Sequence, residues 1–385
     1  MDLPFDHKKM TALMESAGVD LVLASTKDNV RYLTGGHLFF FFAHKDAIGV
    51  SRYLPMLGYP KSGPAEAFYI GSAMEGWQHE VEPIWVENVR NNQWHSETTG
   101  KEAADCIRAL GLEKGTIAIE KGFLPADAFE SLRSGLPDAA FTDALFILEE
   151  LRAVKRPEEL ALLKEASEHI IGSMTAIMRS TPAGTATREI AEAMRKEETQ
   201  RGLDFEYCLT CTGPSFNRAP SSATWDKGNI LSLDSGGNLR GYLGDLCRMA
   251  VIGEPTPLMK DLLGEVQAIQ AAARGAIRPG VTGTEIFEKG RTEQAKCPHN
   301  SEISFVAHGM GMIQHEAPRL SAKSSVPYPG SYAERPIEAG MVLSVETDLK
   351  NPEVGFVKLE DTIVVTEDGW EAYGDSARDW TVVDG

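Results

Sequence analysis

The stretch Ile230-Leu231-Ser232-Leu233-Asp234-Ser235-Gly236, followed by Gly241-Tyr242-Leu243-Gly244-Asp245, decides the fold expected for the second half of this chain. The apolar run that ends in Asp234 is typical of a buried strand, and a charged group there is costly to bury unless it is paired or bound to a metal. Asp245 comes eleven residues after Asp234, with Gly241-Tyr242 in between. This spacing predicts a hairpin that brings two carboxylates to one point.

Three further side chains of the metal-ligand type follow downstream. They are His308 in Ala307-His308-Gly309-Met310-Gly311, Glu346 after the apolar run Met341-Val342-Leu343-Ser344-Val345, and Glu360 in Lys358-Leu359-Glu360-Asp361-Thr362. Each motif alone is more often a turn, a solvent-facing strand residue or a structural histidine. Four carboxylates and one imidazole together suit a pair of divalent ions of the Mn, Co, Zn or Fe kind, since carboxylates bridge ions and imidazole adds a softer ligand.

On these motifs the second half resembles the pita-bread metallohydrolase family, which includes methionine aminopeptidase, Xaa-Pro aminopeptidase, prolidase and creatinase. The resemblance covers about Pro157 to the C-terminus. The matching segments are Asp234-Ser235-Gly236, Gly241-Tyr242-Leu243-Gly244-Asp245-Leu246-Cys247-Arg248, His308-Gly309-Met310-Gly311, His315-Glu316-Ala317-Pro318, Glu346 and Glu360-Asp361-Thr362. The first half resembles, mostly in its layout, the smaller N-terminal domain of the creatinase and prolidase branch.

The expected fold class is therefore α/β (α+β), with a creatinase-like N-terminal α/β domain at residues 1–153 and a pita-bread catalytic domain at residues 154–385. The boundary lies near Arg156-Pro157-Glu158-Glu159, because proline followed by two glutamates is a strong helix start. Helices are expected at 8–16, 101–110, 125–132, 158–179, 187–201, 257–277 and 284–293. Strands are expected at 21–25, 47–50, 67–70, 116–120, 207–212, 229–236, 246–252, 304–307, 341–346, 355–360 and 362–365.

The resemblance implies a role for each metal ligand. Asp234 binds one metal, Asp245 and Glu360 bridge, and His308 and Glu346 complete the second metal. The two ions are expected to be manganese, with cobalt, zinc or iron as alternatives. A metal-bridging water with a lowered pKa is the implied nucleophile, and Glu346 can also relay its proton.

Two residues outside the ligand set also receive implied roles. His315, seven residues after His308, lies beside the substrate, where it stabilises the tetrahedral intermediate or gives a proton to the leaving group. Arg248 forms an ion pair with a ligand carboxylate and so supports the metal site from behind.

One departure from the family bears on the substrate. Peptidases of this family usually carry a histidine upstream of the first metal aspartate, but here no histidine lies between His169 and His299. Arg218 lies in the corresponding stretch, where its planar fork can bind a substrate carboxylate, unless it is simply an exposed loop residue.

The function expected first is hydrolysis of a C–N (amide) bond in a small substrate, as in an Xaa-Pro dipeptidase or aminopeptidase. The close alternative is a hydrolase of a non-peptide compound such as ectoine or creatine. A lyase acting on dimethylsulfoniopropionate is disfavoured, because its first motif usually reads Asp-x-Asp rather than Asp234-Ser235-Gly236. The complete ligand set also disfavours a binding module and a metal-independent enzyme.

Net charge and hydropathy exclude two classes of binding partner, nucleic acids and membranes. The net charge of −18 argues against nucleic acid, which needs a basic surface. No apolar run approaches the length of a membrane span, and no apolar signal follows Met1, so we expect a cytoplasmic protein without a membrane partner. The family resemblance implies a homodimer, in which most of the run Phe39-Phe40-Phe41-Phe42 is buried and one or two of its residues contact the partner's active site.

Overall fold

A computed structural model of the chain describes residues 3–39, 53–322 and 331–384. By their contacts, the residues separate into two compact units, Met1–Leu151 and Arg152–Gly385. The boundary falls within helix α6 (Leu145–Ala153). The strand expected near residues 47–50 and the part of the phenylalanine run after Phe39 lie outside the described residues.

The first unit is built on a mixed six-stranded sheet in the order β4-β3-β2-β1-β5-β6. Its strands are β1 (Leu21–Ala24), β2 (Met56–Pro60), β3 (Phe68–Ser72), β4 (Asn88–Gln93), β5 (Thr116–Ile119) and β6 (Ala140–Asp143). Its helices before α6 are α1 (His7–Ala17), α2 (Lys27–Thr34), α3 (Glu75–Val81), α4 (Ser96–Ala109) and α5 (Ala126–Gly135). Helices α4 and α5 pack closely, because Gly100 lets the two backbones approach: a Cβ there would lie 2.2 Å from the Ala128 carbonyl oxygen.

The second unit is built on an eight-stranded sheet whose main path runs β12-β13-β14-β11-β10-β8, with β15 on β14 and β16 on β11. The strands are β8 (Asp204–Thr212), β10 (Ile230–Leu239), β11 (Tyr242–Ile252), β12 (Ile303–Gly309), β13 (Val342–Asn351), β14 (Gly355–Val365), β15 (Trp370–Tyr373) and β16 (Thr381–Val383). Two short strands, β7 (Thr185–Ala186) and β9 (Thr224–Trp225), pair with each other. The two strands expected at 355–360 and 362–365 are one continuous strand, because Asp361 is held inside it by buried arginines rather than interrupting it.

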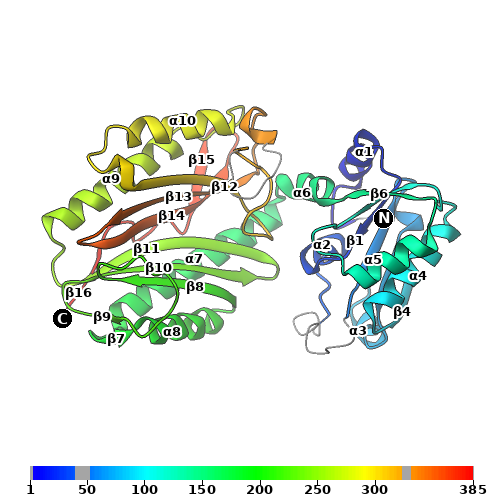
Figure 1. Ribbon diagram of the computed structural model, residues 1–385, viewed down its shortest axis with the longest axis horizontal. Coiled ribbons are helices and arrows are strands. Elements are labelled where there is room, and N and C mark those ends of the chain that lie inside the picture. Colours follow the sequence, from blue (N-terminus) through cyan, green and yellow to red (C-terminus); the bar gives the residue numbers. More distant parts are fainter. Residues whose placement is uncertain (1–2, 40–52, 323–330, 385) are drawn as a thin grey trace. The chain divides into compact units, whose positions relative to one another are not determined.

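Four helices cover this sheet in two pairs (Figure 1). Helices α7 (Pro157–Ser180) and α8 (Thr187–Gln200) pack on the β8, β10 and β11 side, with a core that includes Ile170, Met174 and Leu233. Helices α9 (Pro257–Arg274) and α10 (Gly283–Gln294) pack on the β12 to β14 side. Helix α7 begins as expected, with Pro157 in its first turn and the Glu159 carboxylate accepting from the Arg156 N–H at 2.8 Å.

The hairpin predicted between Asp234 and Asp245 is confirmed. Strands β10 and β11 pair antiparallel from Ile230↔Val251 to Leu239↔Tyr242. The two residues of the turn, Arg240 and Gly241, both have positive φ (53° and 100°), as a type I′ hairpin turn requires.

A buried ion cluster supports the face of the sheet that carries the helices. The Asp361 carboxylate on β14 pairs with Arg248 of β11 at 2.9 Å, Arg274 of α9 at 3.2 Å and Arg378 at 3.0 Å. Arg248 and Asp361 are buried (0% and 1% side-chain exposure), so this contact joins β11, β14 and α9 without solvent screening.

All five cysteines are buried thiols. Cys208 and Cys211 lie three residues apart on β8, so their side chains point to opposite faces of the sheet. Among the described residues, no helix combines the length and the apolar character that crossing a membrane requires.

Replacing Asp361 by Asn is expected to lower the free energy of unfolding by about 3–5 kcal/mol, because it leaves buried arginines without their shared counter-charge. Urea unfolding followed by tryptophan fluorescence measures this loss. The matched control is Asp368→Asn, an exposed residue of the turn after β14, for which a change of no more than about 0.5 kcal/mol is expected. Equal effects of the two variants would show that the cluster does not support the sheet.

Candidate metal centre

The five predicted ligands project from five strands onto one face of the eight-stranded sheet. They are Asp234 on β10, Asp245 on β11, His308 on β12, Glu346 on β13 and Glu360 on β14. Residues two apart on a strand share a face, and so do residues directly opposite each other on paired strands. The strand pairing therefore accounts for the shared face of the whole set.

The register connects these residues step by step. Cys247 lies opposite both Asp234 and Glu360, and it shares its face with Asp245 two residues earlier. Glu360 lies directly opposite Glu346. His308 lies opposite Ser344, which shares the face of Glu346. Buried carboxylates from neighbouring strands are thereby placed side by side.

Three of the predicted ligands come within metal-binding reach of one another. Asp245, His308 and Glu360 each offer a ligand atom within 4.8 Å of the others, and all three residues are buried. The Nε2 atom of His308 lies 3.7 Å from Glu346 Oε1 and 3.9 Å from Glu360 Oε1.

His308 presents a bare nitrogen to these carboxylates. Its Nδ1 lies 3.2 Å from the Gly309 carbonyl oxygen, a geometry in which Nδ1 donates and Nε2 keeps its lone pair. Nε2 is buried and has no hydrogen-bond partner among the described residues. Burial, with a further contribution from His315, lowers the pKa of His308 from 6.5 to about 4, so the imidazole is neutral near pH 7. A neutral imidazole with an unused buried lone pair is suited to metal ligation.

The carboxylates of the centre influence one another strongly. Burial, reinforced by Glu360, raises the pKa of Glu346 to about 7 and that of Asp245 well above its usual value. Burial also raises the pKa of Asp234. Glu360 is the exception: although burial opposes ionisation, Lys358 and His308 lower its pKa to about 2. Such crowded acidic groups favour a bound cation.

Lys358 supplies a cation inside this group of carboxylates. Its Nζ lies 2.7 Å from Asp234 Oδ2, 2.6 Å from Glu346 Oε2 and 2.8 Å from Glu360 Oε2, and its side chain is 4% exposed. Sequence reasoning assigned Lys358 no role. A signal was available, since Lys358 lies two residues before Glu360 on the same strand and must therefore share its face.

Arg218 is neither a free loop residue nor directed at open space. Its guanidinium donates to Asp234 Oδ2, the same oxygen that Lys358 contacts, and its Cζ lies 4.8 Å from the centre of the Phe356 ring. The substrate-carboxylate role expected for Arg218 stays a prediction, and in this structure the carboxylate it binds is that of Asp234.

Two further polar side chains hold Asp245. The Tyr207 hydroxyl donates to Oδ1, and Gln314 Nε2 donates to Oδ2 at 2.8 Å. Neither Tyr207 nor Gln314 was predicted from the sequence. The strand register identifies Tyr207: this residue of β8 lies opposite Gly236 of β10 and therefore shares the face of Asp234. Gln314 lies in a loop, whose position no strand or helix periodicity predicts.

His315 lies against His308, with ring centres 3.8 Å apart and planes inclined by 20°, and it is exposed to solvent. The next residue, Glu316, is buried and anchors this loop through Arg152 at 2.8 Å and Lys155 at 3.2 Å. The role predicted for His315 beside the substrate stays a prediction.

The partner predicted for Arg248 is wrong. Arg248 pairs with Asp361 instead of a ligand carboxylate, and it donates to the main-chain carbonyl of Glu360 at 2.7 Å. The reason is the strand period: Arg248 is three residues from Asp245 and Asp361 is one residue from Glu360, so both point to the face opposite the ligands. Arg248 supports the site through the backbone of β14.

Comparison with known proteins adds independent information. The profile of Metallopeptidase family M24 matches residues 161–367, and that of the Creatinase/Prolidase N-terminal domain matches residues 7–154. An uncharacterized peptidase of Bacillus subtilis, YqhT, is 26% identical over 94% of this chain and 95% of its own length. An Xaa-Pro dipeptidase of Pyrococcus horikoshii is 23% identical over 94% of each chain. The solved Xaa-Pro dipeptidase from Bacillus anthracis has a TM-score of 0.81 at 21% identity, over 97% of this chain and 98% of that one. These matches confirm the predicted fold, a creatinase-like N-terminal domain followed by a pita-bread domain.

In the metal-free protein the His308 imidazole is expected to stay neutral until the pH falls to about 4. Because its folded pKa lies below 6.5, its contribution to stability is complete above pH 6.5 and is lost between pH 6.5 and about 4. Glu346, whose pKa is raised from 4.5 to about 7, acts in the opposite direction, and its contribution is lost as the pH rises between those values.

Because the two contributions overlap, unfolding experiments cannot separate them, whereas an NMR titration of the imidazole signals can. The His308→Asn variant identifies the His308 signal by its disappearance. A His308 midpoint near its usual value of 6.5 would show that the imidazole is not buried as described.

Proposed function

The chain belongs to metallopeptidase family M24, and on that premise we propose that it is a prolidase-like hydrolase that cleaves the C–N bond of a small Xaa-Pro substrate. The observation that carries the proposal is the bare Nε2 of His308, buried and directed at the carboxylates of Glu346 and Glu360. Relatives named Xaa-Pro dipeptidase, aligned over nearly the whole chain, support the substrate class.

Asp245, His308, Glu346 and Glu360 would hold a divalent ion, and their donor set fits one because a neutral imidazole and acidic oxygens converge. A bound ion supplies Lewis acidity and makes water a better nucleophile at neutral pH. Manganese is the ion we propose, since three carboxylates and one imidazole suit it, with cobalt, zinc or iron as alternatives. Metal analysis of protein purified without added metal tests this assignment.

Glu346 is the residue we assign to proton transfer. Its side chain is 20% exposed, so it can reach a bound substrate. His315 is assigned to the substrate side of the site, because it lies on His308 and is open to solvent. From there its imidazole can donate to a developing oxyanion or to the leaving nitrogen.

The second candidate is a hydrolase of a non-peptide nitrogen compound of the ectoine or creatine kind. Arg218 favours it: this side chain fills the space next to Asp234, in the stretch where the sequence lacks the usual peptidase histidine.

The homodimer and the cytoplasmic location implied by the sequence stay proposals. Light scattering tests the first and cell fractionation tests the second.

Manganese-loaded protein is expected to release proline from a Gly-Pro-type dipeptide, and Asp245→Ala is expected to lower kcat/KM at least about 100-fold by removing a ligand. Asp204→Ala, at an exposed position of β8, is the matched control and should stay within about twofold of wild type. Release by Asp245→Ala within a few-fold of wild type would show that the ligand is misassigned. Failure of the loaded protein on dipeptides, with turnover of ectoine or creatine, would favour the second candidate.

His315→Gln is expected to lower kcat by about 10²–10⁴-fold with unchanged metal content, because the side chain acts on the substrate. Steady-state kinetics and metal analysis of the same preparation measure both quantities. Loss of metal from this variant would make His315 a ligand, and an unchanged kcat would remove it from the reaction.

A further inference from the structure

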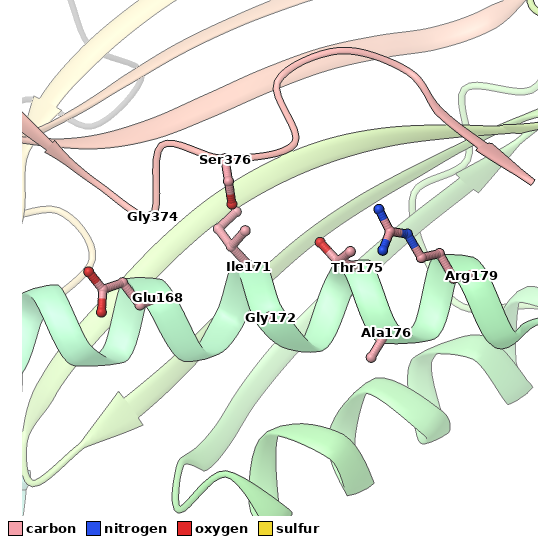
Figure 2. A pocket seen from close by; sticks show the side chains of 8 residues that line it. All are labelled: Glu168, Ile171, Gly172, Thr175, Ala176, Arg179, Gly374 and Ser376. Atoms are coloured by element: carbon pink, nitrogen blue, oxygen red, sulfur yellow. The ribbon is translucent and has the colours of Figure 1, made fainter.

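Two features away from the candidate metal centre are poorly suited to a ligand. Figure 2 shows a surface pocket of about 480 Å³ between α7 and the segment after β15, whose charged lining residues, Glu168 and Arg179, lie at opposite ends. Nothing in its lining selects an occupant. In the first unit, His37, Glu75 and His79 are close enough to hold an ion, but His37 Nε2 already contacts Glu75 Oε2 at 2.8 Å and His79 Nε2 at 3.3 Å, so the facing imidazole nitrogens are not bare as His308 Nε2 is.

Within the centre, the glutamate oxygens divide into two sets. The Oε2 atoms of Glu346 and Glu360 contact Lys358 Nζ at 2.6 and 2.8 Å. Their Oε1 atoms face the bare His308 Nε2 at 3.7 and 3.9 Å. The two glutamates therefore separate a side occupied by a lysine ammonium from a side that ends in an unused imidazole nitrogen.

Asp234 lies on the lysine side. Its Oδ2 accepts from both Lys358 and Arg218, and its side chain is 3% exposed. An ion placed against Oδ2 would have to displace a buried ammonium and a guanidinium that stacks on Phe356. Divalent ions and fixed protein cations at such short range repel each other strongly.

The charge balance points the same way. When ionised, Asp234, Asp245, Glu346 and Glu360 carry four negative charges, and Lys358 and Arg218 contribute two positive charges. The remaining charge of minus two matches one divalent ion. Two divalent ions with both protein cations in place would leave the buried centre with an excess of two positive charges, which is costly in a low-dielectric site.

We propose that this centre binds a single divalent ion, at Asp245, His308, Glu346 and Glu360, and that Lys358, assisted by Arg218, takes the place of a second ion at Asp234. The inference rests on the proposed metal-dependent function and departs from the two-ion centre expected from sequence. Lys358 is thus a positioning residue, which fixes the carboxylates of Asp234, Glu346 and Glu360 without contacting the reacting atoms.

The test is the metal content of the full chain after manganese loading and removal of free ion, measured by mass spectrometry together with the EPR spectrum of the bound Mn²⁺. All proteins carry His79→Ala, so that the cluster in the first unit cannot contribute to the count. We expect one ion per chain and the resolved hyperfine signal of an isolated ion. Lys358→Met, which keeps an unbranched side chain one atom shorter and removes the charge, should take up a second ion and show a broadened, exchange-coupled signal.

Lys350→Met is the matched control, because Lys350 lies on neighbouring β13 and is exposed, and it should keep one ion. Two coupled ions in the Lys358-containing protein would overturn the inference and leave the proposed function intact. No bound ion would overturn both. If Lys358→Met does not fold, the number of bound ions in Arg218→Gln and in the parent protein still tests the inference. Two ions per chain in the parent protein would contradict it directly.

Discussion

Repulsion among four carboxylates on one face of a sheet, three of them buried and one half-buried, is the constraint on which the rest of the second unit depends. Asp234, Asp245, Glu346 and Glu360 cannot all be ionised away from water unless cations lie between them. Lys358 and Arg218 provide part of that charge on the Asp234 side. On the other side, His308 Nε2 is buried without a hydrogen-bond partner among the described residues, and this is where we propose that the ion lies.

The architecture turns this constraint into a defined geometry. Five neighbouring strands each contribute a ligand-type residue in register, while the opposite face carries Asp361 with its arginines and the packed helices. Glu360 and Asp361, which are adjacent in sequence, therefore lie on opposite faces: Glu360 belongs to the candidate metal centre, and Asp361 holds its strand against the helix side through its arginines. A change on the helix side can reach the centre through the backbone of β14, to which Arg248 donates directly.

The sequence was sufficient to predict the hairpin, the two-domain fold and the residues that converge on the site. Asp234 and Glu346 each end an apolar run, and this pattern can be recognised from the sequence without knowing the order of the strands in the sheet. The partner of Arg248 was predicted wrongly, because face alternation across β11 and β14 matters more there than distance along the chain. Tyr207 needed the strand register and Gln314 needed the path of a loop, whereas the spacing of Lys358 from Glu360 already indicated their shared face. The competition of Lys358 and Arg218 for one oxygen of Asp234 is a three-dimensional fact without a sequence signature.

The central claim is that protein cations occupy the Asp234 side of the centre and a single ion occupies the His308 side. Anomalous diffraction from crystals of the manganese-loaded protein, collected at the manganese edge, tests it most directly. The account predicts one anomalous peak bound to His308 Nε2, with Lys358 Nζ still in contact with Asp234, Glu346 and Glu360. Two peaks bridged by Asp245 and Glu360, with Lys358 turned away, would contradict it.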